Sequence, residues 1–371
     1  MTTFNDLSRP WIAGLGIYEP GRPIEEVARQ LGFHDAGEII KLASNENALG
    51  PSPKAAAAIR KASRRMHQYP DGDAFNLRQA LGRKLNIPPE TIITGAGSNE
   101  LIEFIGHVFL DHTTNIVMAD RAFVVYRLMA ALFQAETISV PMVRFTHDLV
   151  AMRRAITPET RVVFIANPNN PTGTMVGQGE LDDFMEGLPE HVIAVFDEAY
   201  IELLSPEDQP DCIKYVREGR KAIVLRTFSK TYGLAGLRIG YAIAPEDCIK
   251  LMHRVRQPFN TSAIAQIAAL AALEDEEFVS KTRAMIREGV NYFESAFLDM
   301  HLEFVPSSAN FILVRVGQGK QVFEAMQKSG VIVRPMDPYG LSDYIRITIG
   351  TRKDNRRCAM ALKRALEITA T

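Results

Sequence analysis

The chain has 371 residues, of which 46% are hydrophobic and 23% charged, and its formal net charge is −2. This composition is ordinary for a globular chain, and the length allows a large core and two domains. The nearly balanced charge gives no reason to expect a nucleic acid or an anionic membrane as a partner. The N-terminus carries no signal-peptide pattern, and no apolar stretch is long enough to span a membrane, so we expect a cytoplasmic protein.

The three cysteines, Cys212, Cys248 and Cys358, lie far apart and have no metal-ligand spacing. Reduced thiols in the cytoplasm are the simplest interpretation. The eight histidines are scattered and form no pair with the spacing of a zinc site. We therefore expect no metal.

The N-terminal stretch, up to about Asn47, has little clear periodicity. Tyr18 stands among glycine and proline residues, which predicts an extended or turned backbone there. A helix is predicted from Pro23 to Leu31, with acidic residues in its first turn. A stronger helical pattern covers residues 52–66, with Ser52 as N-cap, and an amphipathic helix follows within residues 67–86.

From Thr91 onward, strand and helix patterns alternate. Apolar strand segments begin near residues 91, 114, 136, 160, 191 and 221, and helical patterns fill most of the intervals. Such alternation predicts βαβ units and an α/β fold, with a mostly parallel sheet flanked by helices in a large domain.

The pattern changes after Pro245. Two long helical patterns cover residues 245–273 and 275–300, and strands over 310–316, 330–336 and 344–350 surround one further helix. This order predicts a smaller α+β domain. We therefore divide the chain into an N-terminal segment, 1–46, that packs with the small domain, a large domain, 47–245, and a small C-terminal domain, 246–371, that starts with a long linking helix.

Lys230 follows the apolar strand segment that begins at Ala222, between Ser229 and Thr231. Open α/β sheets bind ligands at the carboxyl ends of their strands. A lysine held in a pocket there can form a Schiff base with a carbonyl, and the nearby Arg238 and Ser229 suit a phosphate. Taken alone, such a lysine is more often a surface residue in a glycine-rich turn.

Three other strand ends carry matching groups. The turn Gly95–Ala96–Gly97 can bring backbone N–H groups close to an anion. Asn170 lies in the loop "NPNNPTG", and Asp197 and Tyr200 lie in "FDEAY". Together with Lys230 these residues compose one site for pyridoxal phosphate, in which Asp197 keeps the ring nitrogen protonated. We assign the aldehyde to Lys230, the phenolate to Tyr200 and Asn170, and the phosphate to Ser229, Arg238 and the Gly95–Gly97 backbone.

The strings "NPNNPTG", "DEAY" and "SKTYGLAGLRIGY" resemble the fold-type I pyridoxal-phosphate aminotransferases, and the resemblance runs from about Tyr18 to Arg352. Within that family, "LASNENALGPSP", "QYPDG" and "VIVRPM" are most similar to the histidinol-phosphate aminotransferases. The resemblance implies a homodimer with shared active sites. Tyr69 would reach the phosphate of the cofactor in the partner subunit, and Phe123 would stack on the cofactor ring.

The resemblance also implies substrate-binding residues: Arg346 for the substrate carboxylate, Arg334 for a substrate phosphate, and Tyr18 and Asn170 beside them. One segment departs from the family pattern, because the family usually has "PTY" or "PSF" where this chain has "DRAF", with Asp120 and Arg121 as the departing residues. That departure concerns the shape of a loop and not the cofactor.

We therefore predict an aminotransferase that exchanges amino groups between histidinol phosphate and 2-oxoglutarate in histidine biosynthesis, with imidazole acetol phosphate and glutamate as the other pair. The Lys230 amine would also move the substrate proton. An aromatic amino-acid aminotransferase on the same scaffold is the nearest alternative, and a decarboxylase of a phosphorylated amino acid is a more distant one. A cofactor-sensing domain of a transcription regulator is a third alternative, but the N-terminal stretch is too short for a DNA-binding module.

Overall fold

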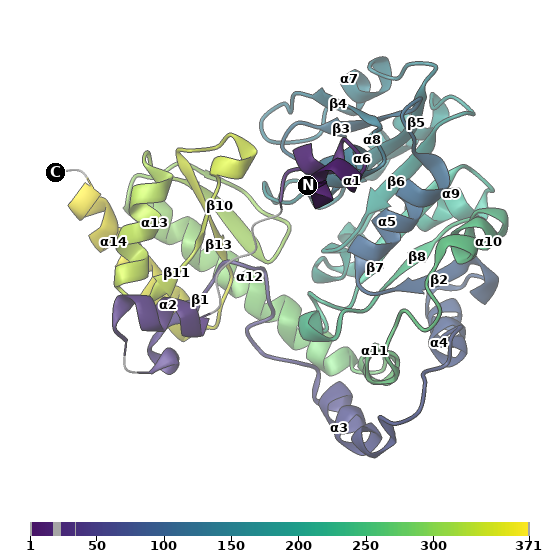
Figure 1. The fold of residues 1–371 in the computed structure, drawn as a ribbon. Helices are drawn as coiled ribbons and strands as arrows, with labels where there is room; N and C mark the ends of the chain where they lie inside the picture. Colours follow the sequence, from purple (N-terminus) through teal and green to yellow (C-terminus); the bar gives the residue numbers. More distant parts are fainter. Residues whose placement is uncertain (1, 18–23, 34, 370–371) are drawn as a thin grey trace.

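A computed structural model describes residues 2–17, 24–33 and 35–369 (Figure 1). Its main element is a seven-stranded sheet of order β2-β8-β7-β6-β5-β3-β4. All neighbours in this sheet are parallel except β8, which runs antiparallel to β2 and to β7. The strands are β2 (Ile92–Gly95), β3 (Asn115–Ala119), β4 (Glu136–Val140), β5 (Thr160–Ala166), β6 (Ile193–Asp197), β7 (Ala222–Thr227) and β8 (Gly240–Ile243).

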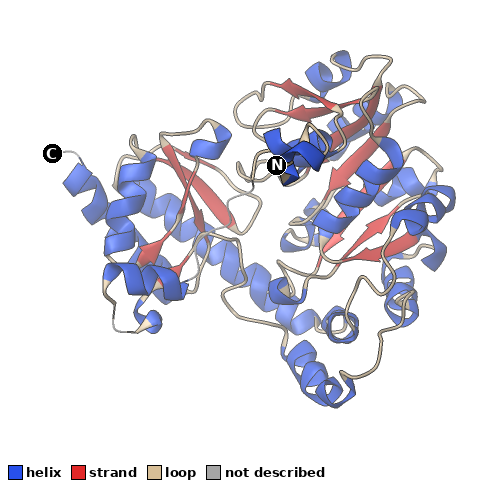
Figure 2. Cartoon of the chain, in the orientation of Figure 1, coloured by secondary structure: helices blue, strands red, loops and turns tan. Residues whose placement is uncertain are grey.

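Helices cover both faces of this sheet (Figure 2). Consequently the middle residues of the central strands form continuous apolar runs, and alternate residues of these runs enter two different cores. Val163 and Ile165 of β5 belong to one core, whereas Val162 and Phe164 belong to the other. The helices of this part are α3 (Pro53–Ala62), α4 (Phe75–Leu85), α5 (Ser98–Phe109), α6 (Val125–Leu132), α7 (Leu149–Arg154), α8 (Gln178–Glu186), α9 (Ile213–Arg217), α10 (Glu246–Val255) and α11 (Ala263–Leu273).

A smaller antiparallel sheet of order β12-β13-β10-β9 forms the second part of the molecule. Its core combines β10 and β13 with apolar faces of three helices. Beside it, β1 pairs with β11 in parallel. These elements are β1 (Ile40–Lys41), β9 (Phe304–Val305), β10 (Phe311–Arg315), β11 (Val331–Ile332), β12 (Arg334–Pro335), β13 (Tyr344–Thr348), α12 (Glu276–Asp299), α13 (Gly319–Lys328) and α14 (Arg352–Thr369). The predicted fold class, a mostly parallel sheet flanked by helices plus a smaller α+β part, is confirmed.

The N-terminal segment touches both parts. Trp11, just after α1 (Phe4–Leu7), donates its indole N–H to the carbonyl of Leu132 in the large part, at 3.2 Å. In contrast, α2 (Ile24–Leu31) buries Val27 and Ala28 against Ile332 of the small part. The predicted division at residues 46 and 245 remains a prediction, because packing does not test which units fold independently.

The helices after Pro245 differ in detail from the sequence pattern. The stretch 245–273 forms two helices, α10 and α11, separated by residues 256–262. Ile249 and Met252 of α10 lie in the core of the large sheet, and α11 packs on α3 and α4. The long helix that joins the two parts in Figure 1 is α12. Within the described ranges, the helices are all too short or too polar to cross a bilayer.

Strand β8 is absent from the strands that the sequence predicts. Gly240 explains why the strand lies there despite its weak pattern. A Cβ at this position would lie 2.8 Å from the Ser98 nitrogen and 2.9 Å from the Arg226 carbonyl. Only glycine lets β8 approach β7 and the start of α5 this closely.

Candidate active site

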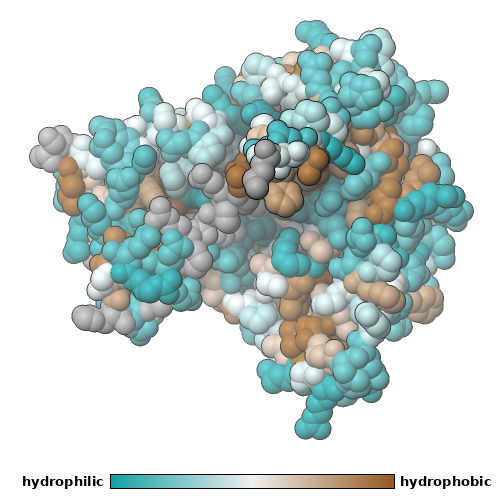
Figure 3. All heavy atoms as spheres, in the orientation of Figure 1, coloured by the Kyte–Doolittle hydropathy of each residue, from teal (hydrophilic) through white to brown (hydrophobic). Residues whose placement is uncertain are grey.

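A cavity of about 890 Å³ lies between the large and small parts of the molecule. Figure 3 shows the surface hollowed between these parts. The cavity opens at the carboxyl ends of β5, β6 and β7, and residues around β12 and β13 form its opposite wall. Nine of the predicted site residues line it: Phe123, Asn170, Asp197, Tyr200, Ser229, Lys230, Arg238, Arg334 and Arg346.

Lys230 enters this cavity three residues after the end of β7. Its Nζ lies 3.4 Å from the Ser44 carbonyl and 5.8 Å from the centre of the Tyr200 ring. Removal from water, together with the positive charge of Arg346, lowers the pKa of Lys230 to about 8. Near neutral pH the amine can therefore give up its proton, as addition to an aldehyde requires.

Asp197 is the last residue of β6 and is 5% exposed. Its Oδ2 accepts a hydrogen bond from the hydroxyl of Tyr126 at 2.7 Å, and its Oδ1 accepts one from the Ala199 N–H at 3.2 Å. Burial raises the pKa of Asp197 to about 6, while these two hydrogen bonds act in the opposite direction. The carboxylate is thus placed to pair with a cation inside the cavity.

Ser229 and Arg238 form one end of the cavity. Nη1 of Arg238 lies 3.4 Å from the Ser229 hydroxyl. Gly97 makes this arrangement possible, because its φ is +80° and a Cβ there would collide with the Arg238 guanidinium. The cavity wall continues into the first turn of α5, at Ser98 and Asn99, where backbone N–H groups favour an anion.

The predicted phosphate turn, Gly95–Ala96–Gly97, lies directly behind this end. The Ala96 N–H donates to Oε2 of Glu100 at 2.6 Å, and the Gly97 N–H donates to the Gly95 carbonyl at 2.8 Å. In this part of the described chain, Ser98 and Asn99 line the cavity, whereas Gly95, Ala96 and Gly97 do not. A direct role for the Gly95–Gly97 backbone in phosphate binding therefore remains a prediction.

Tyr200 faces the cavity and is 4% exposed. Its hydroxyl accepts a hydrogen bond from Nδ2 of Asn45 at 2.9 Å, and burial raises the pKa of Tyr200 to about 12. The hydroxyl therefore keeps its proton and can donate it to a ligand oxygen. Sequence reasoning gave Asn45 no role; the only signal was its place in the string "LASNENALGPSP".

Two arginines stand side by side on the opposite wall. Arg334 of β12 and Arg346 of β13 lie opposite each other in the register of these two antiparallel strands. Arg346 is 7% exposed, donates to Oδ1 of Asn170 and to the Ala43 carbonyl, and lies over the Phe311 ring at 5.1 Å. Two neighbouring guanidinium groups suit a ligand with two anionic ends, or two ligands with one each.

Two tyrosines, Tyr18 and Tyr69, are also predicted for the site. Tyr18 is outside the described residues. Tyr69 is 83% exposed, away from the cavity lining, and stacks on Phe259 with 4.8 Å between ring centroids.

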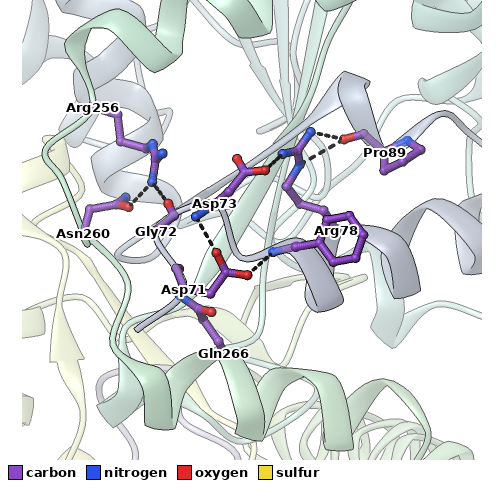
Figure 4. Close-up of polar contacts among 9 residues, drawn as sticks. Asp71, Gly72, Asp73, Arg78, Pro89, Arg256, Asn260 and Gln266 are labelled. Atoms are coloured by element: carbon purple, nitrogen blue, oxygen red, sulfur yellow. Dashed lines mark hydrogen bonds and ion pairs between the residues drawn. The ribbon is translucent and has the colours of Figure 1, made fainter. Parts of the chain in front are cut away.

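The loop that carries Tyr69 is nevertheless well held (Figure 4). Arg256 donates to the Gly72 carbonyl and, at 3.0 Å, to Asn260, and Gln266 donates to the Asp71 carbonyl at 2.8 Å. The Asp71 carboxylate accepts the N–H of Asp73 at 2.9 Å. An exposed aromatic pair on a rigid loop is a suitable contact for another subunit.

The residues present fit pyridoxal phosphate. The lysine has a lowered pKa, a buried carboxylate can hold a ring nitrogen, a neutral tyrosine hydroxyl can donate to a phenolate, and an arginine–serine pair with a helix start can hold a phosphate. All four groups line one cavity.

Comparison with known proteins agrees with this geometry. The family model for aminotransferase class I and II matches residues 37–362. The chain belongs to this aminotransferase family. A histidinol-phosphate aminotransferase of Akkermansia muciniphila is 53% identical over 353 residues, covering 95% of this chain and 96% of that protein. The Moorella thermoacetica protein of the same name is 46% identical and covers 96% and 92%.

A solved structure with a similar fold also belongs to a histidinol-phosphate aminotransferase. The crystal structure of histidinol-phosphate aminotransferase from Sinorhizobium meliloti, in complex with pyridoxal-5'-phosphate, has a TM-score of 0.89 and 28% identity, covering 97% of each chain. The resemblance predicted from the sequence is therefore confirmed. The roles of individual residues remain predictions.

Proposed function

We propose that this aminotransferase uses pyridoxal phosphate to exchange amino groups between histidinol phosphate and 2-oxoglutarate, as a step of histidine biosynthesis. The observation that carries the proposal is the pair Arg334 and Arg346 on the wall opposite Lys230. The names of the relatives support the same substrate and do not favour the aromatic amino-acid alternative.

Different residues of the chain have different roles in the reaction. Pyridoxal phosphate, when bound, supplies an aldehyde that takes up the amino group and a ring that withdraws electrons. Lys230 would hold that aldehyde, and its free amine would carry the proton that leaves the substrate carbon. Its pKa of about 8 suits it both to accept and to return a proton near neutral pH.

Asp197 would keep a proton on the ring nitrogen by supplying a fixed negative charge beside it. The hydroxyl of Tyr200 and the amide of Asn170 would orient the ring at its oxygen substituent, and Ser229 with Arg238 would hold the phosphate. Phe123 would stack on the ring face. These side chains come from the end of β6, from the segments that follow β5, β6 and β7, and from those before α6 and β8, so the strand order of the sheet fixes their relative positions.

Arg346 and Arg334 would each bind a different anionic group of the substrates. Arg346, buried and hydrogen-bonded, binds the α-carboxylate that glutamate brings. Arg334 would bind the phosphate of histidinol phosphate, and the family resemblance assigns Tyr18, which is outside the described residues, to the same substrate. A guanidinium suits both anions because it donates two parallel hydrogen bonds.

The active unit in this proposal is a cytoplasmic homodimer in which Tyr69 completes the partner's site. The exposed Tyr69–Phe259 stack supports it, because a large aromatic pair on the surface is typical of an interface. Size measurement by sedimentation tests the dimer. A mixed dimer of Tyr69→Ala and Lys230→Ala subunits tests sharing: it should regain one functional site, whereas neither parent should be active.

A half-reaction assay tests the substrate. The cofactor-loaded protein is mixed with L-histidinol phosphate, phenylalanine or glutamate, and loss of the aldehyde absorbance is followed. The absorbance in question is that of the cofactor bound to Lys230, and we expect histidinol phosphate and glutamate to remove it rapidly and phenylalanine to remove it slowly. Rapid conversion by phenylalanine with none by histidinol phosphate would contradict the proposed substrate.

A further inference from the structure

We propose that Tyr126 is a positioning residue for the reaction: its hydroxyl holds the Asp197 carboxylate in the place and the ionised form that the cofactor ring nitrogen requires. The proposal rests on the proposed function, because it assigns the ring nitrogen to Asp197. It adds a residue of α6 that lies 71 positions earlier in the chain and that no sequence motif marked.

The geometry fixes the hydroxyl independently of any ligand. Tyr126 is fully buried, and its ring stacks on Phe164 of β5 with 4.4 Å between centroids and an interplanar angle of 6°. Its edge meets the ring of Phe123 at 5.7 Å. The sheet and α6 therefore hold the ring from two sides, and the hydroxyl points at Oδ2 of Asp197 from 2.7 Å away.

The chemistry of Asp197 makes this hydrogen bond consequential. The carboxylate is removed from water, which favours its neutral form, and the adjacent Glu198 adds repulsion. Three groups oppose this: the Tyr126 hydroxyl, the Ala199 N–H at 3.2 Å, and the charge of Lys230. Of these, the Lys230 charge is lost when the amine gives up its proton. Tyr126 and the Ala199 N–H are then the donors that keep Asp197 ionised beside the ring nitrogen.

Another tyrosine supplies a matched control. Tyr215 is 2% exposed and donates its hydroxyl to Oδ1 of Asp182 at 2.6 Å. Its bond thus resembles the bond from Tyr126 to Asp197 in length and donor. Tyr126 and Asp197 line the cavity, whereas Tyr215 and Asp182 do not. Tyr215→Phe removes a buried hydroxyl and its aspartate bond without touching the cofactor site.

The test compares Tyr126→Phe, Tyr215→Phe and the unaltered full-length chain. Apoprotein is titrated with pyridoxal phosphate by equilibrium dialysis, and the pH at which the bound cofactor changes its absorption is recorded. Loss of a hydrogen bond to a charged group predicts a roughly 10- to 100-fold higher dissociation constant for Tyr126→Phe. Its absorption transition should also shift, while Tyr215→Phe keeps both values of the unaltered chain.

A double-variant cycle separates positioning from general loosening of the fold. In an Asp197→Asn background, Tyr126→Phe should cause little further loss of affinity, because its partner is already neutral. Equal losses in both backgrounds would overturn the proposal, as would an unchanged dissociation constant and unchanged absorption transition in Tyr126→Phe. If the unaltered chain fails to bind pyridoxal phosphate, the proposed function itself fails; binding by that chain with no effect of Tyr126→Phe defeats only this inference.

Discussion

The lowered pKa of Lys230 makes a quantitative prediction about how the apoprotein captures its cofactor. The pKa falls from the usual 10.5 to about 8, chiefly because the amine is removed from water and secondly because Arg346 is positive. At pH 7 that difference corresponds to roughly 300-fold more neutral amine than an ordinary lysine has. Since only the neutral amine adds to an aldehyde, the rate of capture should rise tenfold per pH unit up to about pH 8 and then level off.

The assay is stopped-flow absorbance of apoprotein mixed with pyridoxal phosphate between pH 6 and pH 10. Arg346→Gln should move the plateau to higher pH, because it removes the second-largest cause of the lowered pKa. Lys230→Ala is the control and should lack the fast phase altogether. A capture rate in the unaltered chain that keeps rising tenfold per unit beyond pH 9.5 would refute the argument that burial has lowered the pKa of this lysine.

Three further substitutions test other parts of the site and the core. Arg334→Gln should lower kcat/KM for histidinol phosphate roughly 100-fold while the glutamate half-reaction stays within a few-fold, since a buried charge pair is worth several kcal/mol; equal losses for both substrates would contradict its assignment to phosphate. Gly97→Ala should weaken cofactor binding at least tenfold, because φ at this position is +80° and the new Cβ would collide with Arg238. Gly236→Ala is the control: its Cβ would meet open space, so this variant should bind the cofactor normally in equilibrium dialysis. Burial raises the pKa of Glu202 from 4.5 to about 7, so the folded state binds its proton more tightly than the unfolded state does, and stability is lost as the pH rises through 7. Glu202→Gln should therefore raise the free energy of unfolding at pH 8 by about 3 kcal/mol relative to its effect at pH 4.5; urea denaturation that gives the same difference at both pH values would count against it.

The part of the site that the sequence could predict lies at strand ends. Asp197 and Lys230 each follow an unbroken apolar run, and such a run between helical patterns predicts a parallel strand covered on both faces. Strands that are parallel neighbours bring their carboxyl ends to one edge, so residues 33 positions apart in the chain are expected to meet. The register of β6 with β7 places them so, with Asp197 opposite Leu225.

The part that could not be predicted depends on contacts between elements with no shared pattern. Asn45 reaches the Tyr200 hydroxyl only because β1 pairs with β11, which places residues 42–45 beside the small sheet. Tyr126 faces Asp197 because α6 packs over β5 at one particular rotation, and a helical pattern does not specify that rotation. Likewise β8 depends on Gly240, whose absence of a side chain weakens the strand pattern while allowing the close approach.

The two arginines connect the small sheet, where we propose that substrate anions bind, with the residues around Lys230 in the large part. Arg334 and Arg346 belong to the small sheet, whereas Asn170, Asp197 and Lys230 belong to the large part, yet Arg346 donates directly to Asn170 across the cavity. A carboxylate or phosphate that binds the arginines would therefore also lie near the residues proposed to hold the cofactor ring. Because Arg346 is also the second cause of the low pKa of Lys230, an anion that neutralises it should raise that pKa. Substrate binding would then favour the protonated lysine, which is the form able to return a proton to the substrate carbon.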